Sequence, residues 1–362
     1  MSKQFMKYPE LLDFPEVFER RAEFETIIDV RSPAEFAEDH IANAINCPVL
    51  DNDERIVVGT KYKQVGSFEA KRLGAALVAK NIGQHIESLF QDKPRDWKPL
   101  IYCWRGGNRS GSMAHVFAKI GWPVAQLNGG YKAYRQFVNN SLSAELDQFQ
   151  WQVLCGPTGS GKSRTLQTLE RLGAQVLDLE QLAEHRGSVL GGLPEHIQPS
   201  QKQFESRIFE RMQEFSPQKV IYVEAESKKI GDLRVPEHLM SAMRASTCIQ
   251  LRLPTARRVE LLIEEYAHFM HDTESLNKQL HFLTALHGKE KILSWRRMAE
   301  GRELQGLVHE LLEQHYDPAY NKSIIRNFAK YLNAQSIQQN NIDEFDFIDT
   351  ANQILSLADR SS

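Results

Sequence analysis

The chain has 362 residues, of which 41% are hydrophobic and 25% are charged, as expected for a globular protein with more than one domain. The formal net charge of −3 excludes a protein that is basic over its whole surface, so any RNA-binding surface must be a local patch. The four cysteines are far apart and form no Cys-x-x-Cys pair, which argues against a zinc site or a disulfide framework. No apolar run is long enough to span a membrane, and we expect a cytoplasmic protein without a membrane partner.

The first part of the chain alternates apolar runs with segments of helical periodicity. Residues 25–31 predict a strand that brings Asp29 and Arg31 to its carboxyl end, where either could orient a neighbouring loop, and Ser32 then suits the N-cap of a helix. Residues 56–66 predict a loop with a basic tip, and residues 68–90 predict a helix. This alternation continues to about residue 138, with the later helix ending at Gly121, and indicates a parallel sheet covered by helices.

The stretch 101–112, IYCWRGGNRSGS, predicts a strand, a tight glycine loop and the first turn of a helix. Cys103 would face backbone N–H groups, a helix N-terminus and two arginines, all of which favour the thiolate over the thiol. Backbone donors in such a loop also converge on an oxyanion. We therefore predict that Cys103 is a nucleophile, that Arg105 and Arg109 stabilise an oxyanion, and that Ser110 belongs to the same site.

A second motif follows a polar stretch at residues 139–150, where we place the junction between domains. The sequence GPTGSGKS at residues 156–163 matches G-x-x-x-x-G-K-S between a predicted strand and a predicted helix. Lys162 would reach outer phosphate oxygens and Ser163 would hold Mg²⁺. The predicted phosphate- or diphosphate-binding residues are Gly156, Gly159, Ser160, Gly161, Lys162 and Ser163. We predict three regions: residues 1–140, a P-loop domain at 141–255, and a helical extension at 256–362.

Acidic and basic side chains after the P-loop supply further candidates. One predicted strand ends near Asp178 and Glu180, which with His185 and Arg186 either bind a second substrate or form a solvated helix face. Another, which resembles a Walker B strand, ends at Glu224 and Glu226. Asp178 and Glu224 are candidates for a magnesium or acid role, without a firm set of metal ligands. Arg257 and Arg258 either close over phosphates or form a solvated helix face. The stretch 289–297 mixes cations with Trp295, which suits either RNA stacking or a solvated helix over a core tryptophan. The candidate RNA contacts are Arg186, Arg296 and Arg297.

Most of residues 15–138 resembles the rhodanese domain of sulfurtransferases. The resemblance rests on Asp29-Val30-Arg31, Glu35-Phe36, His40-Ile41, Ala44, Asn46 and Pro48, followed by Cys103. It implies a cysteine that carries a persulfide. The basic residue here is the sixth after the cysteine instead of the fifth, and the pattern C-x-x-G-x-x-R-S resembles the loop of cysteine-dependent phosphatases. A longer loop would suit a larger chalcogen or a phosphate-bearing donor. Tyr102 replaces the usual phosphatase histidine and no general acid is evident, which weakens the phosphatase interpretation.

The whole chain resembles the bacterial tRNA 2-selenouridine synthase family, through DVRSPAEF, YCWRGGNRSGS, GPTGSGKS, LAEHRGS and YDPAY. The resemblance implies that selenium replaces sulfur at C2 of a wobble 2-thiouridine in tRNA, with selenophosphate as donor. It also implies S-geranylation from geranyl diphosphate as the preceding step. The expected partners are tRNA and an enzyme that supplies selenophosphate, and no tightly bound cofactor is expected. The loop at Cys103 would act as a cradle for selenophosphate or through a cysteine–selenium intermediate.

Other functions remain compatible with the motifs. One is an ATP-dependent tRNA sulfurtransferase with a persulfide on Cys103. Another is a phosphatase-like domain fused to a small-molecule kinase, and a third is a non-catalytic RNA-binding module with a nucleotide switch. The sequence leaves open whether the P-loop binds ATP or geranyl diphosphate.

Overall fold

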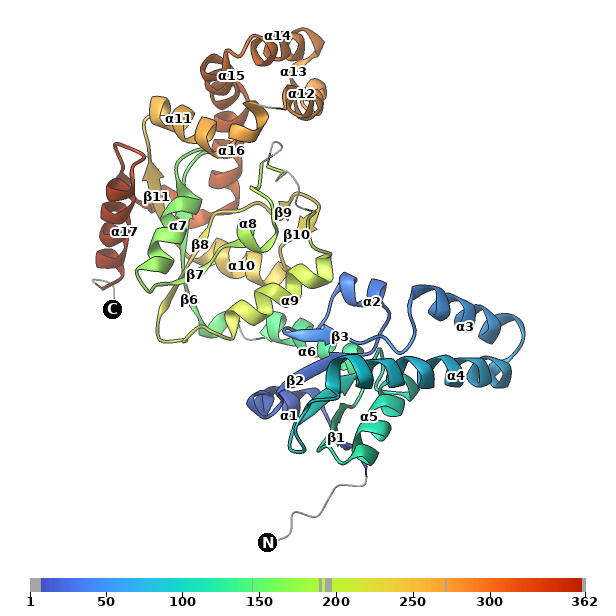
Figure 1. Cartoon of the computed structure of the whole chain (residues 1–362). Coiled ribbons are helices and arrows are strands. Elements are labelled where there is room, and N and C mark those ends of the chain that lie inside the picture. Colours follow the sequence, from blue (N-terminus) through green and yellow to red (C-terminus); the bar gives the residue numbers. More distant parts are fainter. Residues whose placement is uncertain (1–7, 145, 189–190, 193–196, 271, 360–362) are drawn as a thin grey trace. The chain divides into compact units, whose positions relative to one another are not determined.

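The computed structural model describes residues 8–144, 146–188, 191–192, 197–270 and 272–359 (Figure 1). The chain divides into two compact units, Met1–Ser141 and Leu142–Ser362, called the first and second unit below. Each contains a five-stranded parallel sheet with helices, so the predicted α/β class is confirmed. The polar stretch at the predicted junction is largely helical, because α6 continues to Ala144.

The sheet of the first unit has the strand order β1-β5-β4-β2-β3, and every pair is parallel. Its strands are β1 (Glu10–Leu12), β2 (Thr26–Asp29), β3 (Ala44–Asn46), β4 (Pro99–Tyr102) and β5 (Ala125–Leu127). All four residues of β4 are buried, which matches its continuous apolar sequence. The carboxyl ends of β2 and β4 lie side by side, since Asp29 is in register with Tyr102. Cys103 therefore follows directly at this edge of the sheet.

The helices of the first unit are α1 (Phe14–Glu19), α2 (Pro33–Glu38), α3 (Asn52–Gln64), α4 (Ser67–His85), α5 (Asn108–Ile120) and α6 (Gly130–Ala144). A π-helical turn at Ile86–Phe90 extends α4, and a 3₁₀ turn lies at Arg21–Glu23. Two predicted boundaries are confirmed. Ser32 forms a capping box at the start of α2, and Gly121 ends α5 in the left-handed conformation, with φ of +112°.

The loop predicted at residues 56–66 is wrong, because most of this stretch belongs to α3. Asp51 caps the helix by accepting a 2.7 Å hydrogen bond from the Glu54 amide. The structure describes every residue of α3, and none of them is buried. A helix without a buried face has no apolar periodicity, which is why the sequence pattern did not indicate it.

The sheet of the second unit has the order β12-β11-β6-β8-β7, again with parallel pairs. Its strands are β6 (Gln150–Cys155), β7 (Gln175–Leu177), β8 (Val220–Glu224), β11 (Thr247–Arg252) and β12 (Gln335–Gln338). A separate antiparallel pair joins β9 (Lys229–Ile230) to β10 (Leu233–Arg234). The sequence pattern predicted only helices after residue 256. It missed β12 because this edge strand buries Ile337 alone.

The helices of the second unit begin with α7 (Lys162–Arg171), α8 (Leu179–Leu182), α9 (Gln201–Met212), α10 (Glu237–Ala245) and α11 (Thr255–Glu265). They continue with α12 (Thr273–His281), α13 (Thr284–His287), α14 (Lys289–Glu300), α15 (Leu304–Leu311), α16 (Asp317–Asn327) and α17 (Glu344–Asp359). A π-helical turn at Leu312–Tyr316 joins α15 to α16. Shorter 3₁₀ turns lie at Leu146–Gln148, Ala267–Met270 and Ala329–Asn333. Within the described ranges, no helix combines the length and apolarity needed to cross a membrane.

Candidate active sites

Cys103 lies in a cradle between the end of β4 and the start of α5, and only 3% of its surface is exposed. The Ser110 hydroxyl, in the first turn of α5, donates a hydrogen bond to the Cys103 Sγ over 3.2 Å. Gln126 in turn donates from Nε2 to the Ser110 Oγ at 3.0 Å and to the Gly106 carbonyl at 2.9 Å. The structure thus brings the predicted Cys103 and Ser110 together. Gln126, which the sequence analysis did not identify, holds the serine in place.

Two glycines let the cysteine loop pack directly against the turn between β5 and α6. Gly106 and Gly130 both have positive φ, at +66° and +57°. A Cβ atom on Gly130 would lie 2.2 Å from the Cys103 carbonyl oxygen and 2.5 Å from the Gly106 nitrogen. The Tyr131 amide donates a 2.8 Å hydrogen bond to the same carbonyl. The backbone around Cys103 is therefore fixed from outside the loop.

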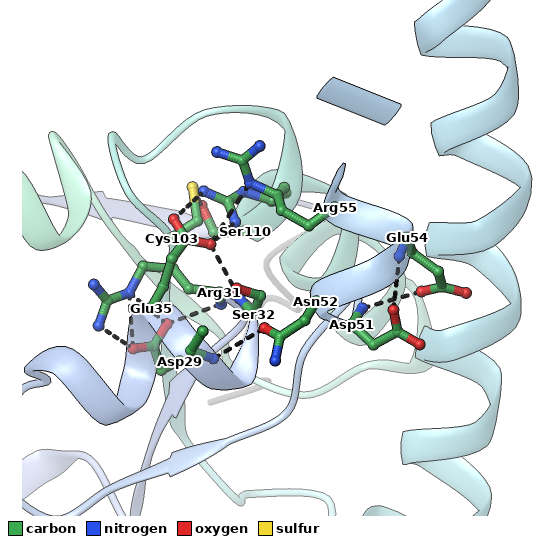
Figure 2. A network of polar contacts seen from close by, with 12 residues as sticks. Asp29, Arg31, Ser32, Glu35, Asp51, Asn52, Glu54, Arg55, Cys103 and Ser110 are labelled. Atoms are coloured by element: carbon green, nitrogen blue, oxygen red, sulfur yellow. Dashed lines mark hydrogen bonds and ion pairs between the residues drawn. The ribbon is translucent and has the colours of Figure 1, made fainter. Parts of the chain in front are cut away.

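Glu35 anchors the basic side chains around the cradle. Its carboxylate lies 2.7 Å from Nη1 of Arg109 and 3.7 Å from Nε of Arg55, and Figure 2 draws Glu35, Arg55, Cys103 and Ser110 together. Burial alone would raise the pKa of Glu35, but the hydrogen bonds and charge of Arg109 lower it below its ordinary value. The Arg109 guanidinium is thus held by a carboxylate, whereas Arg105 is exposed to solvent. Neither Glu35 nor Arg55 was predicted as part of the site.

Asp29 and Arg31 form a buried ion pair beneath the cradle, with 2.6 Å between the Arg31 Nη2 and the Asp29 Oδ2. The Arg31 guanidinium also lies 3.9 Å from the centroid of the Tyr131 ring. The Tyr131 amide donates to the Cys103 carbonyl, so Tyr131 links the ion pair to the cysteine loop. The orienting role of Asp29 or Arg31 stays a prediction.

The P-loop follows β6 and lines a cavity of about 790 Å³. Gly159 and Gly161 have φ of +76° and +80°, which gives the loop its wrapped shape. The Lys162 Nζ donates to the Gly156 carbonyl at 2.9 Å, and the Ser163 hydroxyl donates to the Glu180 Oε2 at 2.9 Å. The predicted phosphate-binding residues of this loop, except for Gly156, thus line one cavity.

Side chains that lie 100 or more residues later in the sequence support the P-loop. Arg258 on α11 donates to the Thr158 carbonyl from Nε at 2.9 Å and from Nη2 at 2.7 Å. Its guanidinium also pairs with Asp317 at 2.6 Å. The Tyr320 hydroxyl accepts the Gly156 N–H at 2.6 Å. Arg258 is only 5% exposed, so neither of the two expectations for the arginine pair holds for it. Arg257 forms an exposed ion pair with Glu260 and matches the solvated helix face.

Four carboxylates gather behind the P-loop. Asp178 caps α8, where it accepts a 2.8 Å hydrogen bond from the Gln181 amide. The acid that contacts Ser163 is instead Glu180. The Glu224 Oε1 accepts the Glu180 amide at 3.0 Å. Burial, together with neighbouring carboxylates, raises the pKa of Asp178 to about 6 and that of Glu180 to about 8. Burial likewise raises the pKa values of Glu224 and Glu226. Asp178 and Glu224 were predicted here for a magnesium or acid role and Glu180 for a second substrate, whereas Glu226 was predicted only to end a strand.

A Mg²⁺ ion in this region would need ligands from the substrate phosphates as well as from the protein. Among the described residues, no group of three or more His, Cys, Asp or Glu side chains is arranged to hold a metal ion. The Glu224 Oε2 is buried without a hydrogen-bond partner among the same residues. Mg²⁺ is commonly bound by one or two protein side chains together with phosphates and water, and this arrangement is compatible with that mode.

The residues predicted to contact RNA do not form one surface. Trp295 is fully buried and donates from Nε1 to Glu310 at 2.9 Å, so the core interpretation of this tryptophan is correct. Arg296 and Arg297 lie on α14, outside the lining of the large cavity. Arg186 lines that cavity, where it donates to the Glu265 carbonyl at 2.5 Å and lies over the Tyr266 ring.

These observations define a two-part enzyme class, in which a rhodanese-like cysteine domain is joined to a P-loop α/β domain. Family models agree: a rhodanese-like domain matches residues 14–137, and a tRNA 2-selenouridine synthase AAA domain matches residues 149–294. A tRNA 2-selenouridine synthase of Sulfurovum sp. (strain NBC37-1) is 31% identical, over 86% of this chain and 93% of that protein. One from Marinobacter nauticus is 32% identical, over 84% and 90%. The chain therefore belongs to the tRNA 2-selenouridine synthase family.

Proposed function

We propose that this chain replaces sulfur with selenium at C2 of a wobble 2-thiouridine in tRNA, in two steps. Its relatives are named for the synthesis of 2-selenouridine in tRNA, which supports selenium-dependent tRNA modification. In the first step the P-loop site transfers a geranyl group to the sulfur. In the second step the Cys103 cradle uses selenophosphate to exchange the alkylated sulfur for selenium.

The single observation that carries the first step is an apolar pocket beside the phosphate cavity. This pocket, of about 60 Å³, is bounded by α11, α15 and neighbouring turns, and its wall is almost entirely hydrophobic. The residues that line both spaces are Thr158, Ser188, Leu262, Tyr266 and Tyr316. A phosphate cradle that opens onto hydrocarbon suits a diphosphate ester of an apolar alcohol better than a nucleotide. The pocket is smaller than a terpenoid tail, so the tail would also lie against Tyr266 and Tyr316 in the larger cavity.

The chemistry of the first step needs a diphosphate held in place while it leaves. The thiouridine sulfur attacks C1 of geranyl diphosphate, an S–C bond forms, the C–O bond breaks, and N3 loses its proton. The P-loop amides and Lys162 would bind the departing diphosphate. Mg²⁺, held by Ser163 with Glu180 or Glu224 and by the phosphates, would supply further positive charge.

The second step needs a good leaving group at C2 and an anionic selenium donor. S-alkylation supplies the leaving group, because geranylthiol departs more readily than sulfide. The cradle would hold the phosphate of selenophosphate over its backbone amides and helix N-terminus. The selenium would attack C2, so that the C–Se bond forms, the C–S bond breaks and geranylthiol leaves. Cys103, as the nucleophile of this domain, would take the phosphoryl group as the P–Se bond breaks, and water would then release phosphate. Arg105 would approach the anion from solvent, and Arg109 would contribute its charge while bound to Glu35.

A pocket-filling substitution tests the first step. Val308 on α15 lines the apolar pocket, and we expect Val308→Phe to raise the KM for geranyl diphosphate at least tenfold while leaving inhibition by inorganic diphosphate unchanged. A shorter donor, dimethylallyl diphosphate, should be affected less. Leu293→Phe, at an exposed position of α14, is the matched control.

Equal KM values for both variants, with ATP consumed in proportion to product, would instead favour the ATP-dependent sulfurtransferase.

A further inference from the structure

We propose that the hairpin formed by α3 and α4, residues 52–85, is the surface of the first unit that binds the RNA substrate. The inference rests on the proposed function, because it takes tRNA as the ligand. It assigns RNA binding to residues other than Arg186, Arg296 and Arg297.

The hairpin presents large apolar side chains to solvent. Helix α3, described in full, buries none of its residues. Its inner side meets α4, where a Cβ on Gly74 would lie 3.4 Å from the Val58 side chain. The exposed apolar residues are Ile56 at 64%, Val57 at 53%, Tyr62 at 58%, Val65 at 64% and Phe68 at 69%. Apolar side chains gathered in this way usually mark an interaction surface.

The charge of the hairpin is opposite to that of the chain. The chain carries a net charge of −3, yet six cations stand against three carboxylates between residues 52 and 85. The cations are Arg55, Lys61, Lys63, Lys71, Arg72 and Lys80, and the carboxylates are Asp53, Glu54 and Glu69. Glu69 already pairs with Arg72 at 2.8 Å. Lys63 and Lys71 are exposed and form no ion pair among the described residues.

Aromatic side chains alternate with these cations at the tip of the hairpin. Tyr62 lies between Lys61 and Lys63 in the sequence, and Phe68 precedes Lys71 and Arg72. Exposed rings can stack on unpaired bases while flanking cations pair with phosphates, which is how proteins commonly bind single-stranded loops of RNA. An uncharged protein surface would leave the cations without partners, so the charge favours RNA.

The base of the hairpin adjoins the cradle of Cys103. The Asn52 Oδ1 accepts the Ala34 amide at 3.0 Å, and Arg55 lies 3.7 Å from Glu35. Figure 2 draws Asn52, Arg55 and Glu35 in the same network as Cys103. A helix of 13 residues is about 20 Å long. An RNA with its target base at Cys103 could therefore extend its neighbouring nucleotides along the hairpin to Tyr62 and Phe68.

The test is the affinity of the full-length protein for a fluorescent anticodon stem-loop that contains 2-thiouridine, measured by anisotropy at several salt concentrations. We expect Lys63→Glu with Lys71→Glu to raise Kd at least tenfold and to reduce the slope of log Kd against log salt by about two. Tyr62→Ala with Phe68→Ala should raise Kd about tenfold with little change in slope. The matched control is Lys93→Glu with Lys119→Glu, which makes the same charge change elsewhere in the first unit. All four positions of the hairpin variants are exposed, and thermal unfolding should confirm unchanged stability.

Each outcome bears on the inference separately from the proposed function. Equal weakening by the hairpin and control variants would indicate a general charge effect and overturn the inference, while the function stands. Unchanged RNA affinity with a lost response to a selenophosphate-supplying enzyme would make the hairpin a protein-binding surface, which also overturns it. If the wild-type protein neither binds nor modifies the RNA, the proposed function itself fails.

Discussion

The two candidate sites are both loops that lead from a strand into a helix, but these loops are supported in opposite ways. The cradle of Cys103 is fixed mainly by backbone packing from the turn at Gly129 and Gly130, within about 30 residues of the cysteine. The P-loop is supported by the side chains of Arg258 and Tyr320, which are 100 and 164 residues from their partners in the loop. The first site therefore depends on close backbone approach, and the second on polar contacts made late in the chain.

Different substitutions should therefore disrupt the two sites. A cradle fixed by backbone contacts tolerates no added atom at the point of contact, whereas a loop held by side chains weakens when a partner is removed. The electrostatics differ as well. Arg109 is paired with Glu35 beside the cysteine, while burial raises the pKa values of Asp178, Glu180, Glu224 and Glu226 behind the P-loop and so favours their uncharged forms.

The largest effect should come from Gly130→Ala. The added Cβ would overlap the Cys103 carbonyl and the Gly106 nitrogen, and alanine is strained at a φ of +57°. We expect a loss of about 3 kcal/mol in the free energy of unfolding of the first unit and a loss of selenation. Gly83→Ala, in the interior of α4 with nothing within 4 Å of the new Cβ, is the control and should be neutral or slightly stabilising. Wild-type stability in Gly130→Ala would contradict this view of the cradle.

A smaller effect is expected from Arg258→Met. The substitution leaves Asp317 without its partner and releases the Thr158 carbonyl, at a cost of about 2 kcal/mol in the free energy of unfolding. The KM for the diphosphate substrate should rise as the loop loses its fixed shape. Arg257→Met, which removes only an exposed pair with Glu260, should change stability by less than about 0.5 kcal/mol. Urea unfolding of the two variants separates these results, and equal stabilities would refute the support assigned to Arg258.

The smallest effect should be seen in Arg109→Gln, and it should depend on pH. Because Arg109 lowers the pKa of Glu35 in the folded chain, the pair stabilises the fold above the ordinary carboxyl pKa of 4.5 and loses this effect as the pH falls. We expect the variant to be less stable than wild type by about 1 kcal/mol at pH 7. The difference should narrow below about pH 4.5. Thermal unfolding between pH 3 and pH 7 measures it, and a constant difference would show that the pair does not act through its charge.

The local motifs of both sites could be predicted from the sequence because each is contiguous. The strand, loop and helix around Cys103, and those around Lys162 and Ser163, follow from residue type and spacing over a few residues. The supporting contacts could not be predicted in the same way. Gln126 and Ser110 are 16 residues apart, Arg109 and Glu35 are 74 apart, and these pairs meet only once the sheet has formed.

Errors in the predicted fold have a related cause. Helix α3 buries no residue and strand β12 buries only Ile337, so neither has the apolar periodicity by which helices and strands are recognised. For Trp295, by contrast, the sequence pattern fitted two interpretations. Its surrounding cations fit an RNA surface, and only its burial identifies it as part of the core of α14.

The central claim is that each unit performs one step of the exchange. Mass spectrometry of nucleosides from 2-thiouridine tRNA tests it most directly, with geranyl diphosphate, selenophosphate or both as donors. We predict that Cys103→Ala retains geranylation and loses selenation, whereas Lys162→Ala loses geranylation but still selenates RNA that is already geranylated. Loss of both steps in either variant would contradict the division between the two sites, and an unchanged nucleoside with wild-type protein and every donor would contradict the function.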